Sequence, residues 1–333
     1  MKIKTAIISG GAGFIGINLY KKIAGCYEKI ICIDNFSLGK IDFLKEFKDH
    51  PKLEIIEADC ANLSLMKKTI KKLIESNHYG DVWHLAANSD IPSGVLDANV
   101  DLKDTFMTTF SILESIKNSP FDSIFFASSS AIYGDHMNTY LNENLGPLLP
   151  ISNYGAMKLS SEAIISAASE SNLRRAVIFR FPNVVGIPAT HGVIYDFTKK
   201  LLKNPKNLSV LGDGSQRKSY LHVDDLIDGM KSIIDCWPGN KKIDIYNIGP
   251  KDDGIYVRDI ANIVASNFSS NVNINFGKGS KGWVGDVPQF FYDTSKITNL
   301  TNWEPKLNSE LAIKKASKQI YSQIVNNQLN LES

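Results

Sequence analysis

The sequence predicts an α/β fold with a doubly wound parallel sheet, followed by a smaller C-terminal α+β lobe. From the first residues to about residue 180, short apolar runs alternate with amphipathic stretches. Strict alternation of strands and helices is typical of parallel sheets with right-handed crossovers. Beyond residue 181 the alternation loosens, and Pro, Gly and Asn become more frequent. We therefore expect one domain over residues 1–180 and a second over 181–333, with a ligand cleft between them.

Six strands are expected in the first domain, because each is a short apolar run bounded by polar or turn-forming residues. They cover residues 3–9, 29–34, 53–57, 81–85, 123–127 and 175–180. Helices are expected between them over residues 14–25, 62–76, 98–117 and 153–171. In the second domain the pattern predicts strands over 208–211 and 243–248 and helices over 223–235 and 256–267.

Composition and charge exclude several classes of protein. The hydrophobic fraction of 43% and the charged fraction of 22% are typical of globular proteins, and no apolar run is long enough to span a membrane. The N-terminus leads directly into a strand and leaves no room for a signal peptide, so we expect a cytoplasmic protein. The net charge is only +2. Nucleic acid and anionic membranes therefore have little electrostatic reason to bind, and we expect small-molecule partners.

The four cysteines give no sign of a disulfide framework or a metal site. Cys26, Cys32, Cys60 and Cys236 form no C-x-x-C pair and have no neighbouring His cluster. We expect free thiols and no bound metal.

A glycine-rich loop follows the first predicted strand, with glycines at Gly10, Gly13 and Gly16. In a dinucleotide-binding Rossmann unit such glycines allow a tight turn, a close approach of backbone N–H groups to a diphosphate, and close packing of the helix on the strand. Asp34 ends the second strand, where a carboxylate can accept hydrogen bonds from ribose hydroxyls. Because that carboxylate would repel a 2′-phosphate and no Arg lies nearby in the sequence, we expect NAD rather than NADP.

Three Tyr residues are followed by Lys at the fourth position, in the pairs Tyr154/Lys158, Tyr195/Lys199 and Tyr292/Lys296. On a helix this spacing places both side chains on one face. An ammonium beside a phenol favours the phenolate, which lowers the phenol pKa and makes a general acid or base. Tyr154 lies 25 residues after Ser129, which follows the strand over 123–127 where the cleft is expected. The other two pairs we interpret as solvated helical pairs.

These residues carry a resemblance to a known family. Over essentially its whole length the chain resembles the extended short-chain dehydrogenase/reductases of the NAD-dependent epimerase/dehydratase family, and among them the UDP-glucose/UDP-galactose 4-epimerases. The matching segments are Gly10–Gly16, Asp34-Asn35 with Gly39, His84–Ala87, Ser129 with Tyr154 and Lys158, Arg180–Gly186, Gly212–Asp225 and Gly285–Pro288.

The resemblance implies roles for individual residues. Ser129 would hydrogen-bond the reacting sugar oxygen, Tyr154 would move its proton, and Lys158 would hold the nicotinamide ribose and tune Tyr154. The implied NAD-binding residues are Gly10, Gly13, Phe14, Ile15, Gly16, Asp34, Asn35, Asp59 at the adenine, Cys60, Leu85, Ala86, Ala87, Tyr154, Lys158 and Phe181. The implied substrate-binding residues are Ser129, Asn183 at a phosphate, Arg217, Lys218 in place of an Arg of the relatives, Tyr220 and Asp286.

Other polar residues near these motifs have a structural interpretation. Ser128 and Ser130 are expected to hydrogen-bond the backbone at the end of the strand. His84 and His222 are expected to be packed and satisfied, because no second ligand lies at metal-binding spacing.

The resemblance implies a nucleotide-sugar 4-epimerase in polysaccharide biosynthesis, which acts by transient oxidation at C4. Dehydratases of this fold place an Asp-Glu pair, or at least a Glu, directly after the catalytic hydroxyl residue, whereas Ser130 and Ala131 stand there in this chain. A 4-ketoreductase of nucleotide sugars would use the same Ser, Tyr and Lys, and a non-catalytic NAD-sensing protein is a third alternative. The relatives pair the helices corresponding to 98–117 and 153–171 in a homodimer, which we expect here also.

Overall fold

The computed structural model describes residues 1–333 except 48, 137–138, 269–270, 280–286, 288 and 333. The chain divides into two compact units that are each built from separate segments. The first unit consists of residues 1–132, 148–180 and 236–246, and the second of residues 133–147, 181–235 and 247–333. The chain leaves the first unit at 133–147 and returns to it at 148. It enters the second unit again at 181 and returns to the first unit once more at 236–246.

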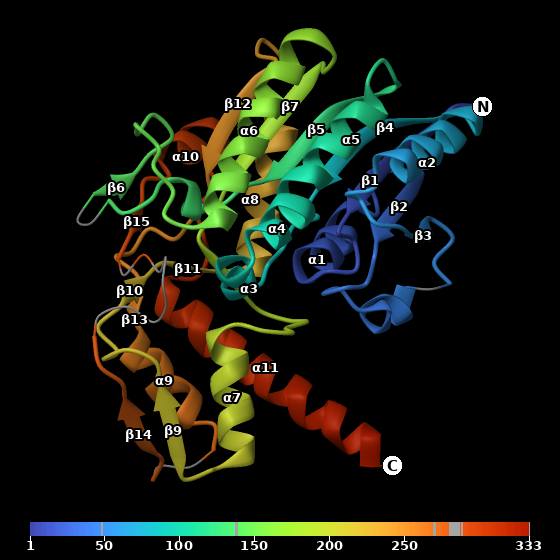
Figure 1. The fold of residues 1–333 in the computed structure, drawn as a ribbon. Helices are drawn as coiled ribbons and strands as arrows, with labels where there is room; N and C mark the ends of the chain where they lie inside the picture. Colours follow the sequence, from blue (N-terminus) through green and yellow to red (C-terminus); the bar gives the residue numbers. More distant parts are fainter. Residues whose placement is uncertain (48, 137–138, 269–270, 280–286, 288, 333) are drawn as a thin grey trace. The chain divides into compact units, whose positions relative to one another are not determined.

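A seven-stranded sheet forms the centre of the first unit (Figure 1). In spatial order its strands are β12 (Ile243–Asn247), β7 (Arg175–Arg180), β5 (Phe121–Ala127), β4 (His78–His84), β1 (Ile3–Ser9), β2 (Lys29–Asp34) and β3 (Leu53–Glu57). All pairs from β7 to β3 are parallel. The order reverses direction after β1, which is the arrangement of the doubly wound fold that the sequence predicts.

The strand at residues 243–247 corrects the sequence prediction, which assigned it to the smaller lobe. It lies at the edge of the central sheet beside β7. Ile243 and Ile245 pack against the core under this sheet. The backbone N–H of Ala176 on β7 also donates a hydrogen bond to the carbonyl of Lys242, just before the strand. The burial of these apolar side chains against the sheet explains why a segment so late in the sequence joins the first unit.

Helices α2 (Leu63–Glu75), α5 (Thr108–Ile116) and α6 (Asn153–Ser171) lie side by side on one face of this sheet (Figure 1). Their buried apolar side chains meet those of the strands in one core, which includes Met66 and Ile70 of α2, Ile112 of α5, Ile165 of α6 and Val82 of β4. Helix α1 (Phe14–Ile23) follows β1. Asn62 caps the N-terminus of α2, where its side chain accepts a hydrogen bond from the N–H of Leu65.

The helical stretch predicted over 98–117 is confirmed, but the sequence did not predict that a π-helical turn interrupts it. The structure has α4 (Ala98–Asp101), a π-helical turn (Leu102–Met107) and then α5, with the short α3 (Ile91–Leu96) before them. In the π-helical turn the Thr108 hydroxyl donates hydrogen bonds to the carbonyls of Thr105 (2.8 Å) and Ala86 (3.2 Å). Hydroxyls that bond to nearby carbonyls compete with the regular helical ladder, and π-helical turns are frequent at functional sites.

The second unit contains small two-stranded sheets and longer helices. The strand pairs are β8 (Asn183–Val185) with β11 (Tyr220–His222), β9 (Asn207–Val210) with β14 (Asn273–Phe276), β10 (Arg217–Lys218) with β13 (Ile255–Tyr256), and β6 (Tyr140–Leu141) with β15 (Phe291–Tyr292). The helices are α7 (Val193–Lys203), α8 (Val223–Asp235), α9 (Val257–Ala265), α10 (Ser295–Thr301) and α11 (Ser309–Glu332). The prediction for 223–235 is confirmed, whereas α7 and α11 were not anticipated.

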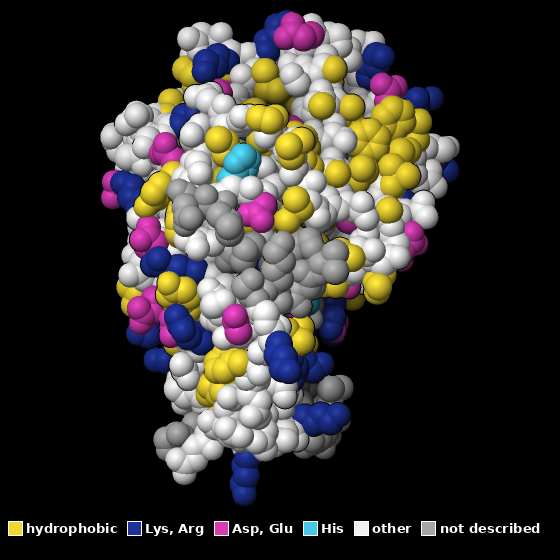
Figure 2. All heavy atoms as spheres, turned by 60° about the vertical axis from the view of Figure 1, so that its left-hand side comes forward, with side chains coloured by type: hydrophobic (Ala, Val, Ile, Leu, Met, Phe, Trp, Pro, Cys, Tyr) yellow, Lys and Arg dark blue, Asp and Glu magenta, His cyan; other side chains and the backbone are white. Residues whose placement is uncertain are grey.

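Surface and helix composition agree with the charge pattern of the sequence. On the face drawn in Figure 2, Lys and Arg side chains are interspersed with Asp and Glu side chains. Among the helices whose residues the structure describes, none combines the length and apolar character that a membrane crossing requires.

Candidate active site

The glycine loop between β1 and α1 has the conformation that a diphosphate site requires. Gly10 has a φ of +73°, and a Cβ atom there would come within 2.8 Å of the backbone nitrogen of Ala86. A Cβ atom on Gly16 would lie 2.4 Å from the carbonyl oxygen of Gly10. Gly13 forms the N-cap of α1 with no side-chain capping bond, so no capping side chain competes for the first N–H groups of the helix, at Phe14 and Ile15, where an anion is predicted to bind.

Asp34, at the end of β2, is hydrogen-bonded to the same loop. Its carboxylate accepts hydrogen bonds from the backbone N–H of Ala12 (2.9 Å) and of Phe36 (2.8 Å). The side chain is buried, and burial raises its pKa while these two N–H groups oppose the rise. Asn35, by contrast, is exposed and accepts hydrogen bonds from the N–H and hydroxyl of Ser37.

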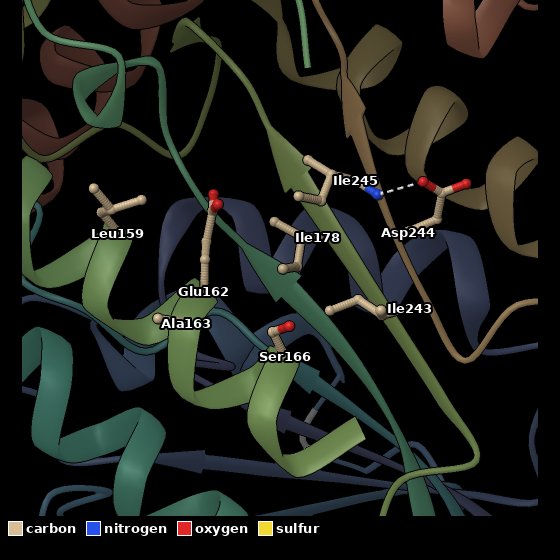
Figure 3. A pocket seen from close by; sticks show the side chains of 8 residues that line it. All are labelled: Leu159, Glu162, Ala163, Ser166, Ile178, Ile243, Asp244 and Ile245. Atoms are coloured by element: carbon tan, nitrogen blue, oxygen red, sulfur yellow. Dashed lines mark hydrogen bonds between the residues drawn. The ribbon is translucent and has the colours of Figure 1, made fainter. Parts of the chain in front are cut away.

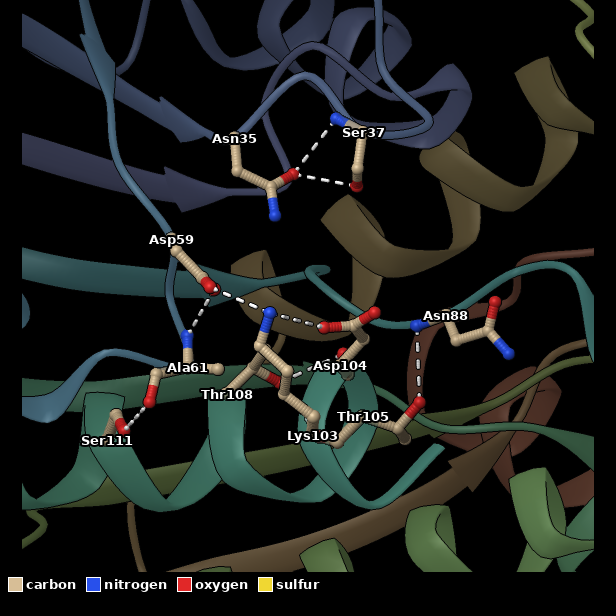
Figure 4. Close-up of polar contacts among 10 residues, drawn as sticks. All are labelled: Asn35, Ser37, Asp59, Ala61, Asn88, Lys103, Asp104, Thr105, Thr108 and Ser111. Atoms are coloured by element: carbon tan, nitrogen blue, oxygen red, sulfur yellow. Dashed lines mark hydrogen bonds and ion pairs between the residues drawn. The ribbon is translucent and has the colours of Figure 1, made fainter. Parts of the chain in front are cut away.

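The predicted adenine end of the cofactor site contains an ion pair that the sequence did not indicate (Figure 4). Lys103, in the π-helical turn, lies 3.2 Å from Asp59 and 3.7 Å from Asp104, measured between nitrogen and oxygen. Asp59 also accepts a hydrogen bond from the N–H of Ala61 at 2.9 Å. The neighbouring Cys60 is buried, which raises the pKa of its thiol to about 12. Cys60 can line the site only as a neutral packing residue.

Ser129, Tyr154 and Lys158 come together where β5 ends. Ser152 caps α6, where its hydroxyl accepts a hydrogen bond from the N–H of Gly155 at 3.1 Å, and this cap places Tyr154 in the first turn. Lys158 follows one turn later, with its Nζ 5.8 Å from the centre of the Tyr154 ring. The side chains of Ser129 and Tyr154 are hydrogen-bonded to each other. The Lys158 ammonium donates to the carbonyl of Ala127 at 2.6 Å.

Burial controls the protonation of this group. It raises the pKa of Tyr154 to about 12, and the negative charge of Asp101 adds to the rise while the hydrogen bond with Ser129 opposes it. Burial also lowers the pKa of Lys158 to about 7, against the opposing charges of Glu162 and Asp101. The prediction that the ammonium lowers the phenol pKa below its usual value is therefore wrong for this structure, because loss of hydration outweighs the attraction.

Leu85, Ala86 and Ala87 follow β4, beside the glycine loop. The backbone N–H of Leu85 donates to the carbonyl of Ser9 at 3.0 Å, and the carbonyl of Ala86 accepts from the hydroxyl of Thr108. The residues predicted from four separate segments of this unit thus lie at the carboxyl ends of β1, β2, β4 and β5, where open α/β sheets bind their ligands.

Comparison with known proteins decides the family. The family model described as the NAD dependent epimerase/dehydratase family matches residues 6–249. The chain belongs to this family. Its cofactor is accordingly NAD, and the assignment of the glycine loop, Asp34 and the Ser-Tyr-Lys group to the NAD site stays a prediction.

Relatives of the epimerase family match nearly the whole chain. A solved structure titled as a UDP-galactose 4-epimerase is 30% identical, with a TM-score of 0.83 over 96% of this chain and 99% of that chain. A UDP-glucose 4-epimerase of Azospirillum brasilense is 24% identical over 90% of this chain and 87% of its own length. A UDP-glucuronic acid 4-epimerase of Bacillus cereus was solved with UDP-glucuronic acid and NAD. It has a TM-score of 0.83, and the match covers 96% of this chain and 99% of that chain. Because the identity is only 23%, this likeness supports the fold alone.

Ser128, Glu162 and Arg180 form a buried hydrogen-bond network next to the Ser-Tyr-Lys group. Arg180 donates from Nε and Nη2 to the two carboxylate oxygens of Glu162, at 3.0 and 2.6 Å. The Ser128 hydroxyl donates to the same carboxylate at 2.5 Å. The prediction that Ser128 bonds the backbone is therefore wrong, since its partner is a carboxylate of α6. This network ties α6 to the ends of β5 and β7.

One pocket of the first unit is separate from this group. It has a volume of about 360 Å³ between α6, β7 and β12 and is lined by Leu159, Glu162, Ala163, Ser166, Ile178, Ile243, Asp244 and Ile245 (Figure 3). None of the predicted catalytic residues lines it, and its walls are mainly apolar. We therefore assign the reaction to the end of β5 and not to this pocket.

Both candidate histidines are packed and satisfied, as expected. His84 is buried, with Nδ1 2.6 Å from the Ser9 hydroxyl and Nε2 2.9 Å from the Thr109 hydroxyl. Burial lowers its pKa to about 3, so it is neutral. His222, in the second unit, lies 3.1 Å from the side-chain oxygen of Gln319 and accepts from the N–H of Asp224 at 3.2 Å.

Of the other Tyr-Lys pairs, one prediction is confirmed and one is wrong. Tyr195 and Lys199 are one turn apart on α7, with the ammonium 5.5 Å from the ring centre. Tyr292 is buried on β15, whereas Lys296 lies in α10, so these two residues share no helix. The spacing is the same in both cases, but the strand end at Tyr292 interrupts the helical register.

The predicted substrate residues of the second unit divide into two groups. Asn183, at the start of β8, is exposed and stands beside the buried Tyr220 in the parallel register of β8 and β11. Lys218 is buried on β10, and its neighbour Arg217 lies 3.7 Å from Asp253 and over the rings of Tyr256 and Phe291. Phe181 is buried in the same unit. Asp286 lies outside the described residues, and the substrate roles of all these residues stay predictions.

Cofactor choice gives a first testable outcome. We expect the Asp34→Asn, Asn35→Arg double variant to gain affinity for NADP relative to NAD by about tenfold or more, because a carboxylate is removed and a phosphate-binding guanidinium is added. Asn retains an acceptor for the Phe36 N–H. Calorimetric titration with both cofactors measures the change. Asn35→Arg alone is the control and should still prefer NAD; a wild-type protein that already favours NADP would contradict the role of Asp34.

Proposed function

We propose that this protein is an NAD-dependent nucleotide-sugar 4-epimerase of the UDP-glucose/UDP-galactose type. The observation that carries the proposal is the group of Ser129, Tyr154 and Lys158 at the end of β5, with Ser130 and Ala131 where a dehydratase has its acid and base. The relatives are named as 4-epimerases of UDP-glucose or UDP-galactose, which supports 4-epimerisation of a nucleotide sugar.

The chain's own residues supply the proton chemistry. Tyr154 accepts the proton of the 4-hydroxyl as the hydrogen of C4 leaves, and returns it when the hydrogen is restored on the opposite face of the sugar. Ser129 holds the same sugar oxygen by a hydrogen bond. The chemistry that bound NAD would supply is uptake of a hydride from C4 and its return, so the net reaction consumes no cofactor. Because burial raises the pKa of Tyr154 to about 12, the phenol must lose its own proton before it can accept that of the 4-hydroxyl, and a positive charge on the nearby Lys158 favours the phenolate.

Two other functions fit less well. A 4-ketoreductase of nucleotide sugars would use the same three side chains, and it differs only in releasing oxidised cofactor after each turnover. A non-catalytic NAD-sensing protein has no need for a Tyr and a Lys in register with Ser129. The homodimer that the family resemblance implies and the cytoplasmic location that the sequence analysis expects both stay proposals.

The proposed reaction is tested by incubating the purified protein with UDP-galactose and NAD. We expect conversion to UDP-glucose, or interconversion of an analogous 4-epimeric pair, with no net change at the NADH absorbance band. Proton NMR of the anomeric signals measures the products. Stoichiometric loss of NADH with a 4-keto nucleotide sugar, and no epimerisation, would instead establish the ketoreductase.

A further inference from the structure

Asp101, the last residue of α4, is a buried carboxylate beside the proposed catalytic group. Its side chain is 0% exposed. One carboxylate oxygen, Oδ1, accepts a hydrogen bond from the side-chain amide of Asn88 at 2.8 Å. Within the part of the chain that the structure describes, the other oxygen, Oδ2, has no hydrogen-bond partner. Buried carboxylates are nearly always paired, and one left half-satisfied costs stability, which a functional role would explain.

The surrounding backbone fixes this carboxylate against the start of α6. A Cβ atom on Gly94 would lie 1.8 Å from Oδ2, so only glycine leaves room for the carboxylate. The carbonyl of Gly94 accepts a hydrogen bond at 2.8 Å from the side chain of Asn153, which immediately precedes Tyr154. Asn88 in turn is held through its backbone N–H by the hydroxyl of Thr105 at 3.2 Å (Figure 4). Asp101 therefore has a defined position at the junction of α3, α4 and α6.

The charge of Asp101 acts on both members of the proton-handling pair. It favours the protonated form of Tyr154 and the protonated form of Lys158. Glu162 also faces Lys158, but Arg180 donates two hydrogen bonds to its carboxylate. Lys158 in turn acts on His84, which is neutral. Burial raises the pKa of Asp101 itself and the charges of Asp104 and Asp90 add to the rise, while the hydrogen bond from Asn88 and the charge of Lys158 oppose it and favour the ionised form. The carboxylate that faces Lys158 without a hydrogen bond from a cation is thus Asp101.

We propose that Asp101 is a positioning residue whose buried negative charge keeps the proton on Tyr154 and on Lys158. It touches neither sugar nor cofactor in this role and acts only through those two side chains. The proposal rests on the proposed function, which gives Tyr154 and Lys158 their proton chemistry. Removal of the charge should make both side chains lose their protons at lower pH, since a carboxylate stabilises the protonated form of each.

The test uses Asp101→Asn in the full chain with NAD bound. Asn can still accept the hydrogen bond from Asn88, so the main change is the loss of charge. We expect both limbs of the pH profile of kcat to move toward lower pH by about 0.5 unit or more. Asp97→Asn is the matched control, because Asp97 is an exposed carboxylate on the same short helix whose capping acceptor Asn can replace. Its profile should coincide with that of the wild type.

A measurement without substrate separates this proposal from the proposed function. In lysine-¹³C-labelled protein, the Cε signal of Lys158, assigned from its loss in Lys158→Arg, should titrate at lower pH in Asp101→Asn than in the wild type. Asp101→Ala serves the same purpose if the Asn variant does not fold. A Lys158 titration and a pH profile that both coincide with the wild type would overturn the proposal, whichever sugar the enzyme uses.

Discussion

Replacement of Tyr154 by Phe should lower turnover by about 10² to 10⁴-fold while the protein still folds and binds NAD, because a positioned acid or base contributes about this much to rate. The substitution removes only the hydroxyl that is hydrogen-bonded to Ser129 and leaves the ring that packs near Lys158. Turnover is measured as the rate of 4-epimerisation under saturating substrate, and NAD binding by calorimetry.

Tyr195→Phe is the matched control for this experiment. Tyr195 is half-buried and has a Lys one turn later on a helix, as Tyr154 does, but it has no serine in the position of Ser129. Its variant should keep turnover within a few-fold of the wild type. If Tyr154→Phe retained more than about a tenth of wild-type turnover, the assignment of the proton transfer to Tyr154 would be wrong.

Glu162→Ala should lower the free energy of unfolding by about 3–5 kcal/mol, because it removes the carboxylate that accepts two hydrogen bonds from the buried guanidinium of Arg180. Both side chains are nearly inaccessible, with exposed fractions of 5% for Glu162 and 3% for Arg180. The Ser128 hydroxyl loses its acceptor in the same variant. Urea unfolding followed by circular dichroism measures the change, and hydrogen exchange of peptides from α6 and β7 locates it.

The control for this second prediction is Glu75→Ala. Glu75 pairs with Lys71 across one turn of α2 at 3.8 Å, and both side chains are largely exposed. Removal of such a surface pair should cost less than about 1 kcal/mol. Equal and small losses in the two variants would show that the buried network does not hold α6 on the sheet.

Sequence patterns were sufficient to predict the bounds of elements whose burial or capping is visible in neighbouring residues of the sequence. The bounds of β1, β2 and β7 agree with the apolar runs, because strands in the middle of a parallel sheet are buried on both faces. Those of the edge strand β3 agree as well, although it is only partly buried. The bounds of α6 agree as well, since Ser152 provides a cap in the sequence itself. With that helix in place, the 25-residue separation of Ser129 and Tyr154 was enough to indicate which Tyr-Lys pair joins the serine.

Features that depend on contacts between distant segments were not predictable. After the π-helical turn, Thr108 at the start of α5 bonds to the carbonyl of Ala86 in the loop after β4. Lys103 of the turn pairs with Asp59, and the buried Asp101 is bonded by Asn88. The raised pKa of Tyr154 depends on its burial, which a Tyr-Lys spacing does not reveal. A strand at residues 243–247 joins the sheet only through its packing beside β7.

The most direct test of the proposed 4-epimerisation follows a deuterium atom at C4 of the nucleotide sugar. If the hydrogen of C4 is removed and then restored to the same molecule, UDP-galactose deuterated at C4 should give UDP-glucose that still carries deuterium at C4. Mass spectrometry and NMR of the product measure its retention. Product with ordinary hydrogen at C4, formed in water without loss of cofactor, would contradict transient oxidation at C4 and with it the role assigned to Ser129, Tyr154 and Lys158.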